Sequence, residues 1–184
     1  MNSITAVFVA SLAAASAAPP SAAEVRLKRL PGAAYEVWGR FTVDASTATV
    51  WSVLTDYEGI PAFVSAMKSS RVREARADGA LLVEQKAVGG MFGLERVATL
   101  LLEVRREKES LLFEDVGRES FWRYEGEWRV QATARGSTAT YRLVAQPDFI
   151  VPPFVLGRVL RRGARELLDD VRAEIVRRSI QERK

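Results

Sequence analysis

Apolar residues recur at steps of three and four along one long segment near the C-terminus, residues 152–178, which predicts a single amphipathic helix. Pro152 and Pro153 suit its first turn, where a missing backbone N–H costs nothing. About 25 residues at 1.5 Å each span roughly 38 Å, a length that a curved sheet can cover. The opposite side, which includes Glu174, is rich in Arg and acidic residues and predicts a solvated face. The apolar stripe consists of Leu156, Leu160, Ala164, Leu167, Leu168, Val171 and Ile175.

The chain before this helix shows the period of two that is typical of β-strands with one buried face. The clearest alternation lies in residues 121–133, and its apolar set must face the interior. That set is Trp122, Tyr124, Gly126, Trp128 and Val130, and the last strand adds Ala139, Tyr141, Leu143 and Ala145. The predicted strands are residues 35–44, 71–76, 80–88, 94–105, 111–116, 121–133 and 138–146.

Two short helices are predicted between the first two of these strands. Ser46 is a good N-cap for a helix that ends at Leu54, because its hydroxyl oxygen can accept from first-turn amides. Residues 60–64 form the second helical segment. The sheet needs a cover for its apolar face, and the C-terminal helix is the long amphipathic element in the sequence. We therefore expect an α+β helix-grip fold, a seven-stranded antiparallel sheet wrapped around a long C-terminal helix.

Residues 1–23 differ from the rest of the chain, with an apolar stretch from Ile4 to Ala18 and small residues throughout. This pattern predicts a signal peptide with cleavage after Ala17 or Ala23, and hence an exported protein, periplasmic or secreted. We assign residues 24–34 to a linker and residues 35–181 to the folded domain.

The 184 residues contain neither cysteine nor histidine, so disulfides, Cys or His nucleophiles and bases, and zinc sites with such ligands are excluded. We expect no metal and no cofactor. The net charge of +4 lies on the last helix, whose basic face could make transient contact with a membrane surface. Nucleic acid is not an expected partner, since no aromatic residues are interleaved with these charges after Phe154.

Several motifs resemble the START-like polyketide cyclase/dehydrase and coenzyme Q-binding family over roughly residues 35–178. They are the run from Val50 to Tyr57 followed by Ile60-Pro61-Ala62-Phe63, the strand that holds Trp128, and the Pro152-Pro153 entry to the closing helix. The resemblance implies a deep cavity between sheet and helix that holds lipids, quinones, polyketides or other hydrophobic molecules.

The predicted function is binding or carriage of such a hydrophobic small molecule. Large aromatic residues on the inner faces bring O–H and N–H groups into the interior, and a cavity with polar groups would satisfy them. The glycine-flanked loop 89–93, with Phe92, and the segment 60–67 are expected to border its mouth. The candidate ligand-binding residues are Phe63, Met67, Phe92, Trp122, Tyr124, Trp128, Tyr141, Leu160, Ala164 and Leu167.

Two other functions remain open from the sequence. A cyclase or dehydratase could use a carboxylate or a tyrosine such as Tyr124 in the same cavity. The same fold with a filled core would instead serve as an interaction or assembly protein. The available acids are Glu84, Glu95, Asp115, Glu119 and Asp148, and no paired-carboxylate spacing stands out, so no catalytic residue is assigned.

Overall fold

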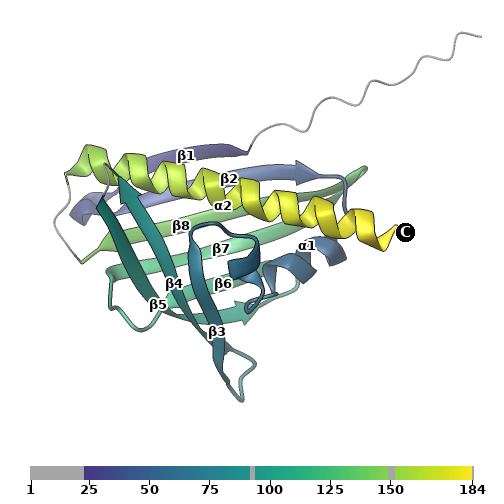
Figure 1. Cartoon of the computed structure of the whole chain (residues 1–184), viewed down its shortest axis with the longest axis horizontal. Helices are drawn as coiled ribbons and strands as arrows, with labels where there is room; N and C mark the ends of the chain where they lie inside the picture. The colour runs from purple at the N-terminus through teal and green to yellow at the C-terminus, as the bar shows by residue number, and fades with distance from the viewer. Residues whose placement is uncertain (1–22, 92–93, 149–151, 184) are drawn as a thin grey trace, which may run out of the picture.

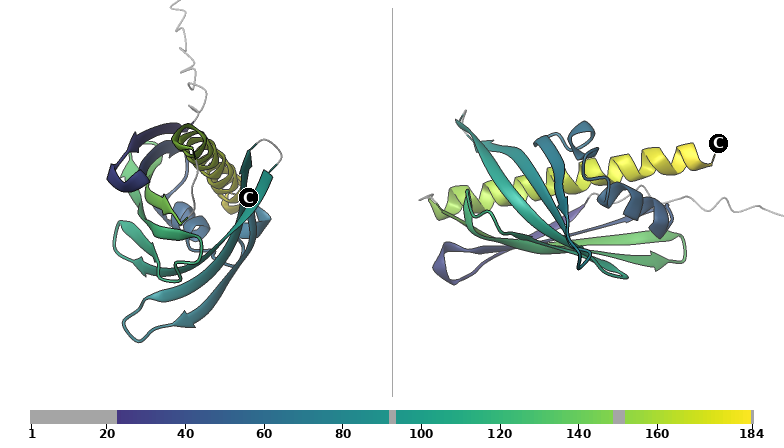
Figure 2. Two further views of the ribbon diagram at one scale, coloured as in Figure 1. Left: turned by 90° about the vertical axis from the view of Figure 1, so that its left-hand side faces the viewer. Right: turned by 90° about the horizontal axis from the view of Figure 1, so that it is seen from below.

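A long C-terminal helix, α2 (Pro153–Glu182), lies across the concave side of a strongly curved antiparallel sheet in the computed structural model (Figure 1). The structure describes residues 23–91, 94–148 and 152–183. In a view close to the axis of α2, the sheet curves around the helix (Figure 2). The sheet order is β1-β2-β8-β7-β6-β5-β4-β3. The β1–β2 hairpin lies at one edge, and the six strands from β3 to β8 form a meander that starts at the other edge and ends beside β2.

The strands are β1 (Glu24–Arg29), β2 (Tyr35–Val43), β3 (Met67–Ala75), β4 (Leu81–Met91), β5 (Leu94–Arg106), β6 (Ser110–Asp115), β7 (Phe121–Thr133) and β8 (Gly136–Pro147). The helical elements besides α2 are α1 (Thr47–Leu54) and two 3-10 turns, η1 (Pro31–Ala33) and η2 (Ile60–Ala62). No helix in the described ranges has the length and apolar character needed to cross a membrane.

The predicted helix-grip architecture is confirmed, and local chemistry explains several of its boundaries. The hydroxyl oxygen of Ser46 accepts from the backbone N–H of Thr49 at 3.1 Å, as expected of the N-cap of α1. β7 pairs with β8 in a long antiparallel ladder that places Trp128 opposite Tyr141. This ladder is the floor of the cavity described below.

The sheet has eight strands, and the prediction of seven was wrong. Residues 24–34 were assigned to a linker, but they form β1 and η1, and β1 pairs with β2 along its whole length. Val25 and Leu27 alternate toward the core and are partly buried there. An edge strand exposes one face and one edge to water, so it can carry many charged residues. The charged residues of β1 therefore give its sequence the composition of a linker.

Two shorter expectations also need correction. The glycine-rich segment 89–93 was expected to be a loop, but Gly89 and Gly90 continue β4 and pair with β5. The hairpin residues 92–93 lie outside the described residues. The second short helix is a single 3-10 turn, since Pro61 and the flanking residues support only three helical positions.

The buried stripe of α2 packs against β1, β2, β4 and α1. Gly39 of β2 permits the closest approach, because a Cβ atom at this position would lie 2.3 Å from the Cδ1 of Leu168, which is fully buried. The glycine therefore sets the depth at which α2 sits in the sheet. The residues of α2 that are buried are Leu156, Ala164, Leu168, Val171, Glu174, Ile175 and Ser179.

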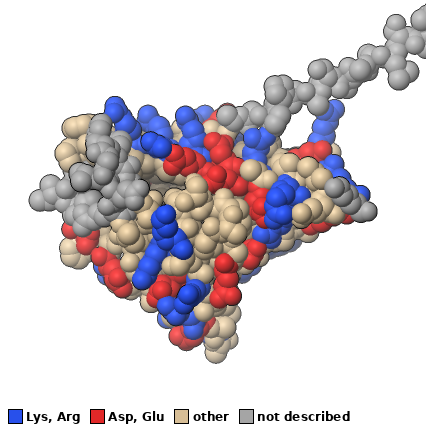
Figure 3. Space-filling view, viewed as in Figure 1, with Lys and Arg blue, Asp and Glu red and all other residues tan. Residues whose placement is uncertain are grey.

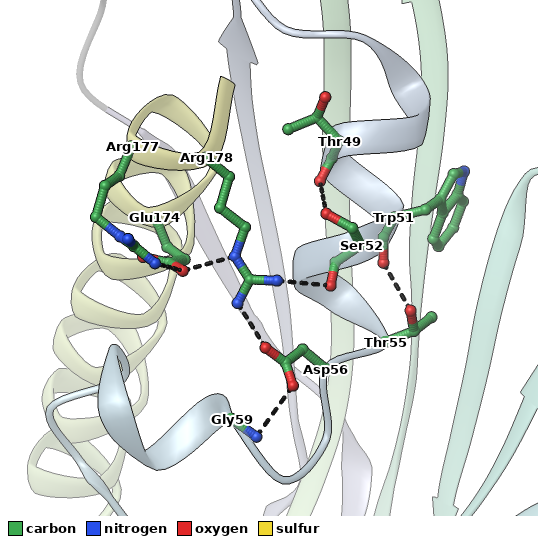
Figure 4. Close-up of polar contacts among 9 residues, drawn as sticks. All are labelled: Thr49, Trp51, Ser52, Thr55, Asp56, Gly59, Glu174, Arg177 and Arg178. Atoms are coloured by element: carbon green, nitrogen blue, oxygen red, sulfur yellow. Dashed lines mark hydrogen bonds and ion pairs between the residues drawn. The ribbon is translucent and has the colours of Figure 1, made fainter. Parts of the chain in front are cut away.

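Glu174 was expected on the solvated face of α2, but it is 6% exposed and anchors a polar cluster between α2 and α1 (Figure 4). Its carboxylate accepts from Arg177 and Arg178 at 2.6 Å. Hydrogen bonds from Arg177, and then from Arg178, lower the pKa of Glu174 against the opposing effect of burial. Arg178 also donates to Asp56 at 2.5 Å and to the carbonyl of Ser52 at 3.1 Å. This cluster ties α1 and the turn after it to the last third of α2.

Candidate functional site

An apolar cavity of about 120 Å³ lies between the inner face of the sheet, α1, η2 and the middle of α2. One wall comes from α1 and the η2 segment, the floor from β4 to β8, and the roof from two residues of α2, Leu167 and Val171. The residues that line it are Val53, Leu54, Tyr57, Ile60, Phe63, Val64, Met67, Gln85, Leu102, Val104, Leu111, Phe113, Tyr124, Trp128, Tyr141, Leu167 and Val171.

Aromatic rings form the floor of the cavity. The ring centroids of Trp128 and Tyr141 are 4.7 Å apart, and those of Phe113 and Tyr141 are 6.2 Å apart in a stacked arrangement. Phe113 fills the space above Gly126, where an added Cβ would lie 2.5 Å from its ring. Rings with offset or tilted contacts of this kind make a rigid apolar platform.

The polar groups in the cavity are few and uncharged. Tyr124 and Tyr141 both line the cavity, and Tyr141 is 3% exposed. Burial is the main cause that raises the pKa of both, and that of Tyr141 is raised well above 10.0, so both stay protonated at neutral pH. On the other side, Gln85 donates from its amide nitrogen to the hydroxyl of Ser70 at 3.2 Å. These groups can donate to or accept from a ligand without carrying charge.

Of the ten candidate residues, six line the cavity: Phe63, Met67, Tyr124, Trp128, Tyr141 and Leu167. Phe92 lies outside the described residues. The other three are placed elsewhere.

Trp122 was predicted to face the interior, but its side chain is 65% exposed. The register between β7 and β8 shifts here, because Phe121 pairs with Pro147 and Arg123 pairs with the next residue, Gln146. Trp122 is therefore the extra residue of a β-bulge, which reverses the direction of its side chain. Phe121 takes the inner position, with its ring centroid 5.0 Å from that of Tyr124.

Leu160 and Ala164 were expected in the roof, but neither lines the cavity. Both pack in the core nearer the start of α2, where β1 and β2 come close to the helix. The roof is shifted toward the C-terminus, to Leu167 and Val171.

Sequence reasoning missed the wall formed by α1 and η2 and part of the floor. Val53 and Leu54 are buried residues of α1, but nothing in the local sequence pattern shows that they face a cavity. Gln85 lies two residues from Val83 and two from Ala87 in β4, so all three share the inner face. This period of two is visible in the sequence and could have identified Gln85.

No charged residue is among those that line the cavity in the part of the chain that the structure describes. Glu84 is paired with Arg73 at 2.7 Å, and Glu119 and Asp148 are exposed. Asp115 is buried on the inner face, next to the cavity rather than in its wall. Across residues 23–91, 94–148 and 152–183 no acidic cluster is arranged to hold a metal ion. The arrangement suits apolar binding with a few uncharged hydrogen-bonding groups.

Comparisons with solved structures show the same architecture at low sequence identity. The STAR-related lipid transfer protein of Xanthomonas axonopodis has a TM-score of 0.68 at 16% identity, over 86% of this chain and 96% of that one. The Zhui aromatase/cyclase of Streptomyces sp. R1128 has a TM-score of 0.66 at 18% identity, over 79% and 95% of the two chains. Human STARD10 has a TM-score of 0.68 at 12% identity, over 87% and 71%. These likenesses establish the fold.

A search of the curated proteins finds no relative of this chain by sequence. The family profile described as polyketide cyclase / dehydrase and lipid transport matches residues 43–172, which include α1, the cavity floor and the roof. By this match and by its helix-grip fold, the chain belongs to the polyketide cyclase/dehydrase and lipid transport family.

Proposed function

We propose that this protein binds and carries an uncharged hydrophobic small molecule, such as a lipid, an isoprenoid, a quinone or a polyketide-like compound, in the cavity under α2. The observation that carries the proposal is the lining itself, which is apolar and aromatic apart from three tyrosines and Gln85. Apolar surface transferred from water into such a cavity is stabilised by about 25 cal/mol per Å². The family match and the likeness to a lipid transfer protein and an aromatase/cyclase support the same class of ligand.

The cavity volume sets a condition on this function. At about 120 Å³ it is smaller than the roughly 300–1,000 Å³ of a typical small-molecule site and close to the size that holds one benzene ring. A longer ligand therefore requires the wall to move outward. The η2 segment is held to α2 by Asp170, whose carboxylate accepts from the N–H and hydroxyl of Ser65 at 2.9 Å. These exposed hydrogen bonds are weak enough to break on ligand entry.

A cyclase or dehydratase is the second candidate, and the Tyr124–Tyr141 pair favours it, because a neutral phenol can donate to a ligand carbonyl. Aldol-type cyclisation also needs a general base. A tyrosine whose pKa is raised cannot take that role at neutral pH, and the buried carboxylate of Asp115 lies beside the cavity rather than in its lining, so binding without chemistry is the better-supported function. An interaction protein with a filled core is the third candidate, and the cavity weighs against it.

Native mass spectrometry of the protein purified from its own host tests the proposal. We expect a bound mass that organic extraction removes and that returns when the extract is added back. A neutral fluorophore such as N-phenyl-1-naphthylamine should bind the extracted protein and be displaced by the extract. Protein that carries no extractable molecule and does not bind the fluorophore would overturn the proposal. A bound molecule that changes mass on incubation would favour the cyclase.

We also propose that carriage involves brief contact with an anionic membrane surface through the basic face of α2. Phe154 is 72% exposed at the start of the helix, and Arg side chains gather along α2 with acidic residues between them (Figure 3). Attraction to anionic lipid would fall with salt. Flotation with vesicles that contain phosphatidylglycerol should show binding at low salt, lost on replacement of the exposed arginines by Gln. The arginines to be replaced are the exposed ones in the first half of α2, Arg158, Arg161, Arg162 and Arg165.

A further inference from the structure

A second hollow, of about 290 Å³, lies beside the apolar cavity where β6 and β7 separate. The last pair of their ladder is Glu114 with Glu125, and beyond it the two strands diverge. Tyr124 lines both the cavity and this hollow, so the two adjoin at this side chain. The hollow, which we call the β6–β7 window, is lined by Glu114, Asp115, Arg118, Trp122, Arg123, Tyr124, Glu125 and Gln146.

Asp115 is the unusual residue of the window. Its side chain is on the inner face of β6, two residues beyond Phe113 and opposite Leu102, and both of these line the cavity. Cβ atoms of directly paired residues lie about 5 Å apart, so Asp115 borders the cavity as well as the window. The residue is 3% exposed.

The two carboxylate oxygens of Asp115 differ in their partners. Oδ1 accepts from the backbone N–H of Leu101 at 2.9 Å and of Gly117 at 3.1 Å, which fixes the orientation of the carboxylate. Oδ2 is buried, and no group among the described residues donates to it. A buried acceptor without a partner destabilises the fold, and more so when it is charged. The fold therefore holds an oriented acceptor at the border between an apolar cavity and a polar window.

We propose that the ligand of this protein is an apolar molecule with a neutral hydroxyl group at one end, and that Asp115 Oδ2 accepts the hydrogen bond from this hydroxyl in the β6–β7 window. This inference rests on the proposed function, because the apolar part of the same molecule occupies the cavity. It adds a ligand class and an orientation, with the hydroxyl toward β6 and β7 and the apolar body under α2.

A hydroxyl fits the window better than an ammonium group or a carbonyl. The carboxylate oxygen can only accept, which excludes a carbonyl as its partner. Tyr124 lines the window as well as the cavity, and its phenol O–H can donate to a ligand group there. A hydroxyl can accept from Tyr124 while it donates to Asp115, whereas an ammonium cannot accept. An ammonium would also lose its hydration when its apolar body enters the cavity.

Charges around the window agree with a neutral ligand group. Arg123 is engaged by Glu125 in an ion pair at the rim. Arg118, which adopts a left-handed backbone conformation with φ of 52°, brings a second guanidinium to the same hollow. The window thus holds three carboxylates and two guanidinium groups, which disfavours an anionic ligand group and leaves the choice between ammonium and hydroxyl to the hydrogen-bonding geometry.

A pair of ligands that differ at the hydroxyl tests the inference. Decan-1-ol and its methyl ether, 1-methoxydecane, are compared by displacement of N-phenyl-1-naphthylamine from the wild-type protein. We expect the alcohol to bind about 10- to 100-fold more tightly, the range for a hydrogen bond to a charged acceptor. In Asp115→Asn an amide N–H₂ can replace Oδ2 while an oxygen remains for the two backbone donors. The preference for the alcohol should then disappear or reverse.

The control is Glu125→Gln, which removes a carboxylate of the same window that does not face the cavity, and it should keep the preference for the alcohol. Equal affinities of the wild type for alcohol and ether would overturn the inference and leave the proposed function intact, since both compounds would still bind. An unchanged preference in Asp115→Asn would overturn it too, because Oδ2 would then be satisfied by water or by Arg118. Failure of every compound and of the fluorophore to bind would overturn both proposals. If Asp115→Asn does not fold, the wild-type comparison alone still decides.

Discussion

Replacement of Val171 by Phe should fill the cavity without breaking the fold. Val171 is buried in α2 and lines the roof, so a larger side chain at this position extends into empty space. A cavity of about 120 Å³, at about 24 cal/mol per Å³, destabilises the ligand-free protein by about 3 kcal/mol. Phe should recover up to half of this, about 1.5 kcal/mol, and raise the Tm by about 3–6 °C. Binding of N-phenyl-1-naphthylamine should be lost.

Ala164→Phe is the matched control, since Ala164 is buried on the same helix and does not line the cavity. Overpacking there should cost about 1–3 kcal/mol and lower the Tm. Thermal unfolding followed by circular dichroism, with fluorophore titration on the same samples, measures both effects. If Val171→Phe is destabilised as much as Ala164→Phe, the space under α2 is not available to a side chain. If Val171→Phe still binds the fluorophore, the ligand site lies elsewhere.

Three further predictions concern other parts of the chain. Gly39→Ala should lower the stability by about 1–3 kcal/mol in urea unfolding, because its Cβ would overlap the buried side chain of Leu168; an unchanged midpoint would contradict this packing. The pKa of Glu174 is lowered in the folded state, so its stabilisation is present above the usual pKa of 4.5 and is lost as the pH falls through the folded value. Glu174→Gln should therefore lower stability at pH 7 by about 1–3 kcal/mol and reduce the acid dependence; equal acid profiles of the two proteins would count against it. N-terminal sequencing should find cleavage after Ala17 rather than Ala23, because Ala23 is 5% exposed in the core and cleavage after it would remove this residue from the folded domain; an intact N-terminus would refute export.

The elements with a complete local pattern could be predicted from the sequence. The stripe of α2 and the alternation of β7 each show which side is buried, because a period of three to four or of two residues follows from the geometry of one chain segment. β1 could not be predicted in this way, because Glu24–Arg29 has four charged residues in six and lacks a clear local pattern. It becomes a strand only by pairing with β2.

Trp122 shows how one residue of local irregularity defeats a correct pattern. The alternation of β7 continues through this position in the sequence, but the bulge opposite Pro147 and Gln146 inserts an extra residue and turns the indole outward. A bulge depends on the register with the neighbouring strand, which no pattern within β7 encodes.

The sequence by itself determined the fold class, the inner face of most strands and the covering helix, because burial of a periodic apolar face is a property of each segment. Only the tertiary structure decided which inner residues border empty space. Leu167 and Val171 line the cavity while Ala164 does not, although all three share one stripe. A cavity is the difference between the space enclosed by distant elements and the volume of the side chains that enter it. The depth of α2 against Gly39, the position of η2 and the rings on β7 and β8 set that difference together.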